Sequence, residues 1–189
     1  NSGTASSATR AVQCGYDFST SAAGARKIEQ LNIASAGAGT NFGELSVTSS
    51  QSNLGFGNST RGILSQGYDS SAAYTNVLEY VTIASAGDGT DFGDMTIARI
   101  LGSACASTTR GVMNCGFVSG SNHSNVMDYV TIGSTGNATD FGDLSVAKGG
   151  VSSASSFTRA LLGGGHTPSE VNTIEYVTIA TTGNTADFG

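Results

Sequence analysis

Short apolar runs recur along the chain, and each is bounded by glycine, serine, threonine or asparagine. Residues 77–84 are rich in β-branched and aromatic side chains, which predicts a strand. Two further strands are predicted on either side of the Thr109-Arg110 step, at 103–106 and 111–115. Because no window keeps a helical period, the pattern indicates an all-β chain.

Another set of strands is predicted directly after each Phe-Gly step, at 44–47, 94–98 and 143–147. In residues 173–180 the alternating positions divide into two faces. One face carries Thr173, Glu175, Val177 and Ile179, and the other carries Ile174, Tyr176, Thr178 and Ala180. Both faces are largely apolar, so we expect this sheet to be covered on both sides.

The strand pattern is copied four times, with three anchors in a fixed order. The first anchor is an arginine, at Arg10, Arg61, Arg110 and Arg159. The second is an acidic residue within an apolar strand, at Glu29, Glu79, Asp128 and Glu175. The third is a phenylalanine followed by glycine, at Phe42, Phe92, Phe141 and Phe188. A period of about 49 residues indicates one supersecondary unit in repetition.

The repeat predicts a single array over residues 1–189, with approximate units 1–48, 49–98, 99–147 and 148–189. Each unit holds four short antiparallel strands with two apolar faces, which is unstable alone. Radial stacking of such sheets buries both faces, so we predict a β-propeller. A β-solenoid is the alternative, but its coils have shorter periods. The chain begins and ends inside its own repeat, and the simplest interpretation is a fragment of a larger propeller.

The units resemble the kelch family of propellers. Arg159 leads through Leu161-Leu162 to Gly163-Gly164-Gly165, and Ile174-Glu175-Tyr176 follows. This order is similar to the kelch sequence of arginine, glycine doublet and acidic-Tyr strand. The chain departs from the family in two ways, because the glycine run occurs in the fourth unit alone and tryptophan is absent.

The segment Tyr-Val-Thr-Ile-Ala-Ser, followed by Thr-Asp-Phe-Gly-Asp, also resembles kelch-type repeats of bacteriophage and other virion proteins. This resemblance implies a tail-fibre or adhesin-like protein, extracellular or on a virion. We therefore expect a non-enzymatic module that recognises a cell-surface glycan or protein receptor. The first alternative is a structural spacer that contacts other virion or filament subunits. The second is an enzyme of the galactose-oxidase type.

Composition narrows the possible partners. The chain has 27 Gly, 1 Pro, 12% charged residues and a net charge of −6. Nucleic-acid binding depends on Lys and Arg that neutralise phosphates, so this weakly acidic chain disfavours it. No stretch approaches the roughly 18 apolar residues that span a bilayer, and we expect no membrane insertion.

The repeated charges predict structural ion pairs. A charge held at one repeat position is expected to serve the repeat, and arginine suits bidentate pairing with a carboxylate. We expect each anchor arginine to pair with an acidic anchor, within or between blades. Arg110→Ala should then destabilise the protein far more than Lys148→Ala. The alternative is a ring of arginines that lines the central channel and binds an anion.

The turn Asp88-Gly89-Thr90-Asp91-Phe92-Gly93-Asp94 suggests a calcium site. Asp88, Asp91 and Asp94 are spaced three residues apart in a glycine-rich loop, and calcium prefers such oxygen ligands. The other copies replace one or more of these carboxylates. The alternative is a turn stabilised by Asp and Asn side chains. We otherwise expect no cofactor.

The loops between the glycine step and the acidic strand differ in length and sequence. They carry Phe18, Tyr74, His123 and His166, which are our candidate binding residues. The alternative is that these loops merely tolerate drift. With two histidines no catalytic triad or copper ligand set emerges, so catalytic residues are not assigned.

Three cysteines are too few for a disulfide framework. Cys105 and Cys115 flank the Thr109-Arg110 step symmetrically, and a hairpin there would place them face to face. Two interpretations remain open, a disulfide or two small apolar residues in a tight sheet. Cys14 has no obvious mate.

Overall fold

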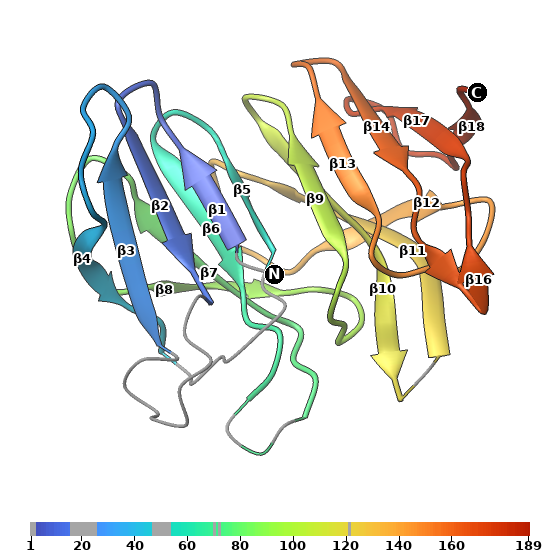
Figure 1. Cartoon of the computed structure of the whole chain (residues 1–189), viewed down its shortest axis with the longest axis horizontal. Helices are drawn as coiled ribbons and strands as arrows, with labels where there is room; N and C mark the ends of the chain where they lie inside the picture. Colours follow the sequence, from blue (N-terminus) through green and yellow to red (C-terminus); the bar gives the residue numbers. More distant parts are fainter. Residues whose placement is uncertain (1–2, 16–25, 47–53, 70, 72, 121) are drawn as a thin grey trace.

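The computed structural model describes residues 3–15, 26–46, 54–69, 71, 73–120 and 122–189 (Figure 1). Every regular element in this part of the chain is a β-strand, and it contains no helix that could cross a membrane. The strands form four antiparallel four-stranded sheets, arranged as the blades of a β-propeller. The predicted all-β fold is confirmed.

Within each blade, every strand of the sheet pairs with the next one along the chain. In blade 4 a small separate hairpin lies between the second and third strands of the sheet. Blade 1 contains β1 (Gly3–Ser6), β2 (Arg10–Cys14), β3 (Lys27–Asn32) and β4 (Thr40–Glu44). Blade 2 contains β5 (Gly55–Gly57), β6 (Arg61–Ser65), β7 (Val77–Thr82) and β8 (Thr90–Asp94). Blade 3 contains β9 (Ser103–Ala106), β10 (Arg110–Ser119), β11 (Asn122–Thr131) and β12 (Thr139–Asp143). Blade 4 contains β13 (Ser152–Ser155), β14 (Arg159–Gly163), β17 (Ile174–Thr178) and β18 (Ala186–Asp187), with the hairpin β15 (His166–Thr167) and β16 (Ser169–Glu170).

The turn between the first and second strands is built the same way in every blade. A serine or asparagine side chain accepts a hydrogen bond from the backbone N–H of the anchor arginine, at 2.9–3.2 Å. The accepting residues are Ser7, Asn58, Ser107 and Ser156. Such side-chain bonds favour a tight turn over a continued strand. We call the end of the molecule that carries these turns the turn end.

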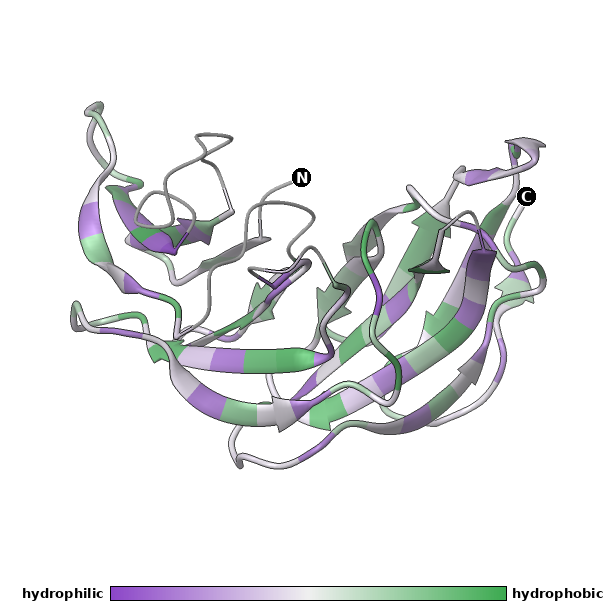
Figure 2. Ribbon diagram, turned by 90° about the horizontal axis from the view of Figure 1, so that it is seen from below, coloured by the Kyte–Doolittle hydropathy of each residue, from purple (hydrophilic) through white to green (hydrophobic). Residues whose placement is uncertain are grey.

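The hydrophobic core lies between the blades. Val81 and Ile83 of blade 2 share one cluster with Val12, Ile28 and Phe42 of blade 1. Equivalent clusters fill the spaces between blades 2 and 3 and between blades 3 and 4. Burial of each such side chain contributes about 1.5–3 kcal/mol. Figure 2 shows apolar residues alternating with polar ones along the strands.

The Phe-Gly step lies inside the fourth strand of blades 1, 2 and 3, so the predicted bounds 44–47, 94–98 and 143–147 are wrong; in blade 4 the step follows β18. In blade 2 the ring of Phe92 is buried. A Cβ on the following Gly93 would lie 2.6 Å from the backbone carbonyl of Gly136 in blade 3. The glycine therefore lets the next blade's backbone pack directly on this strand. The chain then leaves the sheet, because Met95 enters the core between the blades.

The blades are arranged in an open arc, with blade 1 at one end and blade 4 at the other (Figures 1 and 2). The first strands of neighbouring blades are in contact, β1 with β5, β5 with β9 and β9 with β13. Blades 2 and 3 are therefore covered on both faces by neighbours. Each end blade has one neighbour in the described part of the chain.

Candidate functional site

In blades 2, 3 and 4 the described parts of the connections between the second and third strands lie at the end opposite the turn end (Figure 1). We call this the loop end. Of the predicted binding residues, Tyr74, His123 and His166 lie there. Phe18 lies outside the described residues. The structure brings the two histidines together and places Tyr74 in a separate group.

In blade 2 the loop is held by a pair of tyrosines and an aspartate turn. The rings of Tyr68 and Tyr74 meet edge to face with centroids 5.3 Å apart. Asp69 Oδ1 accepts hydrogen bonds from the backbone N–H groups of Ser71 at 2.8 Å and Ala73 at 2.9 Å. The hydroxyl of Ser71 and these N–H groups hold the pKa of the Asp69 carboxyl below its usual value. Tyr74 is thus a structural partner of Tyr68 in this loop.

Between blades 3 and 4, Phe117, His123 and His166 form what we call the Phe117–His cluster. The ring centroids of Phe117 and His123 are 4.3 Å apart, and those of His123 and His166 are 5.2 Å apart. Gly149 bonds to the backbone of His166 in both directions, at 3.0 and 2.9 Å. A Cβ on Gly149 would lie 2.4 Å from the Phe117 ring, so glycine is required for this contact.

One nitrogen of the His123 imidazole, Nε2, is buried and has no hydrogen-bond partner among the described residues. Burial lowers the pKa of His123, and the nearby His166 lowers it further. Both effects disfavour the protonated form of His123.

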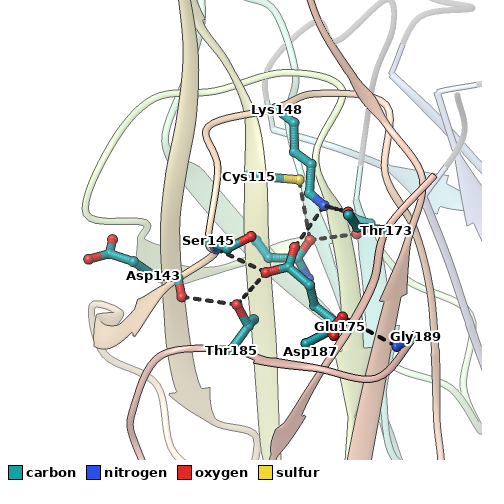
Figure 3. A network of polar contacts seen from close by, with 11 residues as sticks. Cys115, Asp143, Ser145, Lys148, Thr173, Glu175, Thr185, Asp187 and Gly189 are labelled. Carbon is teal, nitrogen blue, oxygen red and sulfur yellow. Dashed lines mark hydrogen bonds and ion pairs between the residues drawn. The ribbon is translucent and has the colours of Figure 1, made fainter. Parts of the chain in front are cut away.

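Two buried ion pairs underlie the loop end. Arg99 pairs with Asp128, and Lys148 Nζ lies 2.7 Å from Glu175 Oε2. Figure 3 shows Lys148 and Glu175 with their neighbours. Burial alone would raise the pKa of the Glu175 carboxyl, but hydrogen bonds led by Lys148 hold it at about 2. Burial also lowers the pKa of Arg99 to about 10.

The predicted pairing of the anchor arginines Arg10, Arg61, Arg110 and Arg159 with the acidic anchors is wrong. In blade 2, Arg61 is paired with Thr82 and Glu79 with Leu64, so the two lie three residues apart along the ladder. Arg61 instead donates to the carbonyl of Ile132 in blade 3 at 2.9 Å. Its guanidinium also lies over the Tyr80 ring, 4.2 Å from the centroid.

Three of the acidic anchors, Glu79, Asp128 and Glu175, turn toward the residues that follow the fourth strand of the preceding blade. Glu79 accepts from the backbone N–H of Ser46 in blade 1 at 3.0 Å, and Glu175 accepts from Ser145 in blade 3 at 2.9 Å. Ion pairs do form at Asp128, at Glu175 and at Glu29, whose partner Lys27 is 2.6 Å away. The cations come from linkers or from the same strand.

The acidic turn joins blades as well. Asp88 Oδ1 accepts from the backbone N–H of Glu44 in blade 1 at 3.0 Å. Asn137 and Asn184 make the same bond in the next two copies, at 3.1 and 3.0 Å. Asp88, Asp91 and Asp94 belong to no group of three possible metal ligands in the described part of the chain. The geometry matches the turn interpretation, and calcium binding stays a prediction.

The disulfide interpretation is wrong. Cys105 and Cys115 form no disulfide, and all three cysteines, Cys14, Cys105 and Cys115, are buried. The turn occupies residues 107–109, so the hairpin places Cys105 opposite Val112. Burial raises the pKa of Cys105 to about 12 and that of Cys115 to about 11, which makes both thiols poor nucleophiles.

A hollow near the turn end was not foreseen from the sequence. Between blades 1 and 2 a cavity of about 630 Å³ is lined by polar groups that include Arg10, Gln30 and Thr40. Ser7 and Thr9 of the first turn line it too. Arg10 Nη1 donates to the carbonyl of Ile83 at 2.8 Å, which fixes the guanidinium at the wall of this cavity. We call it the Arg10 pocket.

The Arg10 pocket arises where one repeat departs from the others. Gln30 stands at the position of Tyr80, Tyr129 and Tyr176, whose rings lie against the anchor arginines of their own blades. Because blade 1 lacks this tyrosine, no aromatic ring of its own blade covers the Arg10 guanidinium. Gln30 Oε1 is buried with no hydrogen-bond partner in the described residues. The signal in the sequence was Gln30 itself, which replaces the tyrosine of the other three repeats.

Comparison of the chain with protein-family models and with curated proteins finds no match.

Proposed function

We propose that the chain is a non-enzymatic recognition module that binds an acidic saccharide in the Arg10 pocket. The observation that carries the proposal is the pocket itself, a hollow of about 630 Å³ with a fixed guanidinium in its wall. Preformed concave sites with a few convergent polar groups are the usual form of ligand sites.

The groups around the pocket select the ligand class. Arg10 uses one nitrogen on the Ile83 carbonyl, and its other N–H groups fit a carboxylate. The hydroxyls of Thr9 and Thr40 and the amide of Gln30 suit ligand hydroxyl groups. A carboxylated sugar supplies both features.

Two resemblances support placing this module on a virion or another extracellular surface. They are the kelch-like order of the anchors and the similarity of the repeat sequence to kelch-type repeats of virion proteins. A cell-surface glycan would then be its natural target. The loop end, with Tyr74 and the Phe117–His cluster, is the second surface available for a glycan or protein receptor.

The test is a binding measurement on a panel of neutral and carboxylated saccharides, by calorimetry, with calcium and with a chelator. We expect saturable binding of carboxylated members. The key variant is Gln30→Tyr, which restores the residue of the other three repeats. It should fill the pocket, raise the melting temperature and abolish binding. Tyr74→Ala at the loop end is the control and should leave saccharide binding unchanged.

Undiminished binding by a stable Gln30→Tyr variant would exclude the Arg10 pocket as the site. Loss of binding in Tyr74→Ala would move the site to the loop end. Loss of binding with the chelator would implicate Asp88, Asp91 and Asp94, the predicted calcium turn. Absence of saccharide binding in every condition would favour the second candidate function.

That second candidate is a structural or assembly role in a virion or surface filament. One observation favours it, the exposed ring of Phe157 at the turn end, in a hollow that it lines together with the turns of blades 1, 2 and 3. An exposed aromatic ring in such a hollow is available for contact with another subunit.

A further inference from the structure

The turn between the first and second strands carries one residue at its tip that faces solvent in every blade. The tip residues are Ala8, Ser59, Thr108 and Phe157, and all four are exposed. Blades 2 and 3 have a neighbour on each face, and their tip residues are exposed like the others. The exposure of this position is therefore a property of the turn itself.

Phe157 departs from the small side chains that occupy the tip in the other three repeats. It is 77% exposed, the highest value among the large apolar side chains of the described residues. A single exposed apolar side chain is common on protein surfaces, so the surroundings of the ring decide what it can do.

The ring of Phe157 lines a hollow of about 500 Å³ together with the turns of blades 1, 2 and 3, which we call the Phe157 hollow. Its walls combine apolar groups, such as Ala8 and Ala106, with the hydroxyl side chains of Ser59 and Thr108. None of the described side chains that line it is charged. The hollow therefore suits a neutral group that has both apolar and hydroxyl surfaces.

The polar side chains of the hollow have two different roles. Asn58 and Ser107 hold their own turns by accepting backbone hydrogen bonds. Asn58 Nδ2 also donates to the carbonyl of Thr108 at 3.0 Å, which ties the turn of blade 2 to that of blade 3. The hydroxyls of Ser59 and Thr108 take no part in these bonds, so they can donate to and accept from a ligand.

The Phe157 hollow adjoins the Arg10 pocket. Ser7, Ala8 and Ser59 line both of them. Their volumes, about 630 and about 500 Å³, lie in the range of roughly 300–1,000 Å³ that is usual for ligand sites. One contains a guanidinium and the other has no charge. A ligand that spans both must therefore carry a negative group on one part and be neutral on the adjacent part.

We infer that the Phe157 hollow is a second saccharide subsite, which binds an uncharged sugar residue next to the carboxylated residue in the Arg10 pocket. This inference rests on the function proposed above for that pocket. The C–H groups on one face of a sugar ring carry a small positive charge, and they pack against the negative face of an aromatic ring. The sugar hydroxyls can bond to Ser59 and Thr108. The ligand is then a short acidic oligosaccharide and not a single sugar.

The experiment is calorimetry of the full chain with two probes, glucuronic acid and a tetrasaccharide of alternating glucuronic acid and N-acetylglucosamine. The wild type should bind the tetrasaccharide more tightly than the monosaccharide. Phe157→Ala should weaken tetrasaccharide binding about three- to tenfold and leave glucuronic acid binding unchanged. Phe188→Ala removes another exposed ring from blade 4 and is the matched control, which should bind both probes like the wild type. Gln30→Tyr should abolish binding of both.

The outcomes separate this subsite from the Arg10 pocket. If glucuronic acid binds but Phe157→Ala leaves tetrasaccharide binding unchanged, the second subsite is wrong and the Arg10 pocket stands. If neither probe binds the wild type, the proposed function and the subsite both fail. Sedimentation of the unliganded protein is the second measurement. A smaller sedimentation coefficient for Phe157→Ala than for the wild type would assign the ring to a contact between copies and overturn its saccharide role.

Discussion

At the residue scale, the anchor arginines show how one side chain serves two blades at once. Arg110 lies over Tyr129 of its own blade and donates to the carbonyl of Ile179 in the next. The ring and the carbonyl compensate the charge without a carboxylate, and the cation–π contact is worth about 0.5–1 kcal/mol. The sequence revealed that the arginine serves the repeat, but not which atoms it contacts.

The linker cations carry the larger energetic consequence. Lys148 is 1% exposed, and its loss would leave Glu175 buried and unpaired. Lys148→Ala should therefore cost about 3–5 kcal/mol in the free energy of unfolding. Arg159→Ala removes an exposed side chain that stacks on Tyr176, and should cost no more than about 1 kcal/mol. Chemical denaturation of both variants measures the difference, and equal costs would contradict the buried pair. From the sequence, Arg110→Ala was expected to cost more than Lys148→Ala. That expectation rested on an arginine–carboxylate pair, but Arg110 donates to the Ile179 carbonyl and Lys148 forms the buried pair with Glu175.

Low pH should destabilise the protein through the Lys148–Glu175 pair. The pKa of Glu175 is lowered to about 2, so the unfolded state binds more protons at low pH. The stability that Glu175 contributes is complete above about pH 4.5 and is lost as the pH falls toward 2. Denaturation curves between pH 5 and 2 should decline less steeply for Glu175→Gln than for the wild type. Parallel curves for the two proteins would assign acid sensitivity to other carboxylates.

At the scale of elements, the fourth strand of blades 1, 2 and 3 is shaped by the blade that follows it. Gly142 has a φ of 140°, and a Cβ there would lie 2.4 Å from the carbonyl oxygen of Gly183 in blade 4. Both the backbone conformation and the close approach exclude a side chain. The Phe-Gly step is therefore a joint between blades as much as part of a strand.

A pair of glycine substitutions tests this joint. Gly142→Ala should destabilise the protein by at least about 1–3 kcal/mol, because backbone must move to admit the methyl group. Gly133→Ala is the control, since a Cβ there meets nothing within 4 Å. Melting temperatures of the two variants give the comparison. If Gly142→Ala melts like Gly133→Ala, the close packing of the blades is wrong.

Strands could be predicted from the sequence better than their bounds and register. The β-branched run at 77–84 predicted β7, because apolar alternation reflects burial directly. The strand around Phe92 was placed too late, because its end is set by contacts with blade 3. The symmetric placement of Cys105 and Cys115 also failed. Ser107 fixes a turn centred before Arg110, and the spacing of cysteines carries no information about it.

At the scale of the whole molecule, repetition made the fold predictable and concealed the site. Three anchors in fixed order were enough to predict four-stranded blades, because each blade is a copy of one structural unit that packs against its neighbours. The Arg10 pocket depends on Gln30, and on Ile83 more than 50 residues away. The contacts between one repeat and another are set by the tertiary structure and cannot be read from the local sequence. The burial of Lys148 in an irregular linker was hidden for the same reason.

The Arg10 pocket makes the contact between blades 1 and 2 less well packed than the contact between blades 2 and 3. In blades 2 and 3 a tyrosine ring lies against the anchor arginine, whereas Gln30 leaves a hollow of about 630 Å³ beside Arg10. Fewer packed side chains lower the free energy of local opening, so amide hydrogen exchange in β2 should be faster than in the equivalent strands β6 and β10. The departure from the repeat that creates the hollow would then also decide which blade opens first.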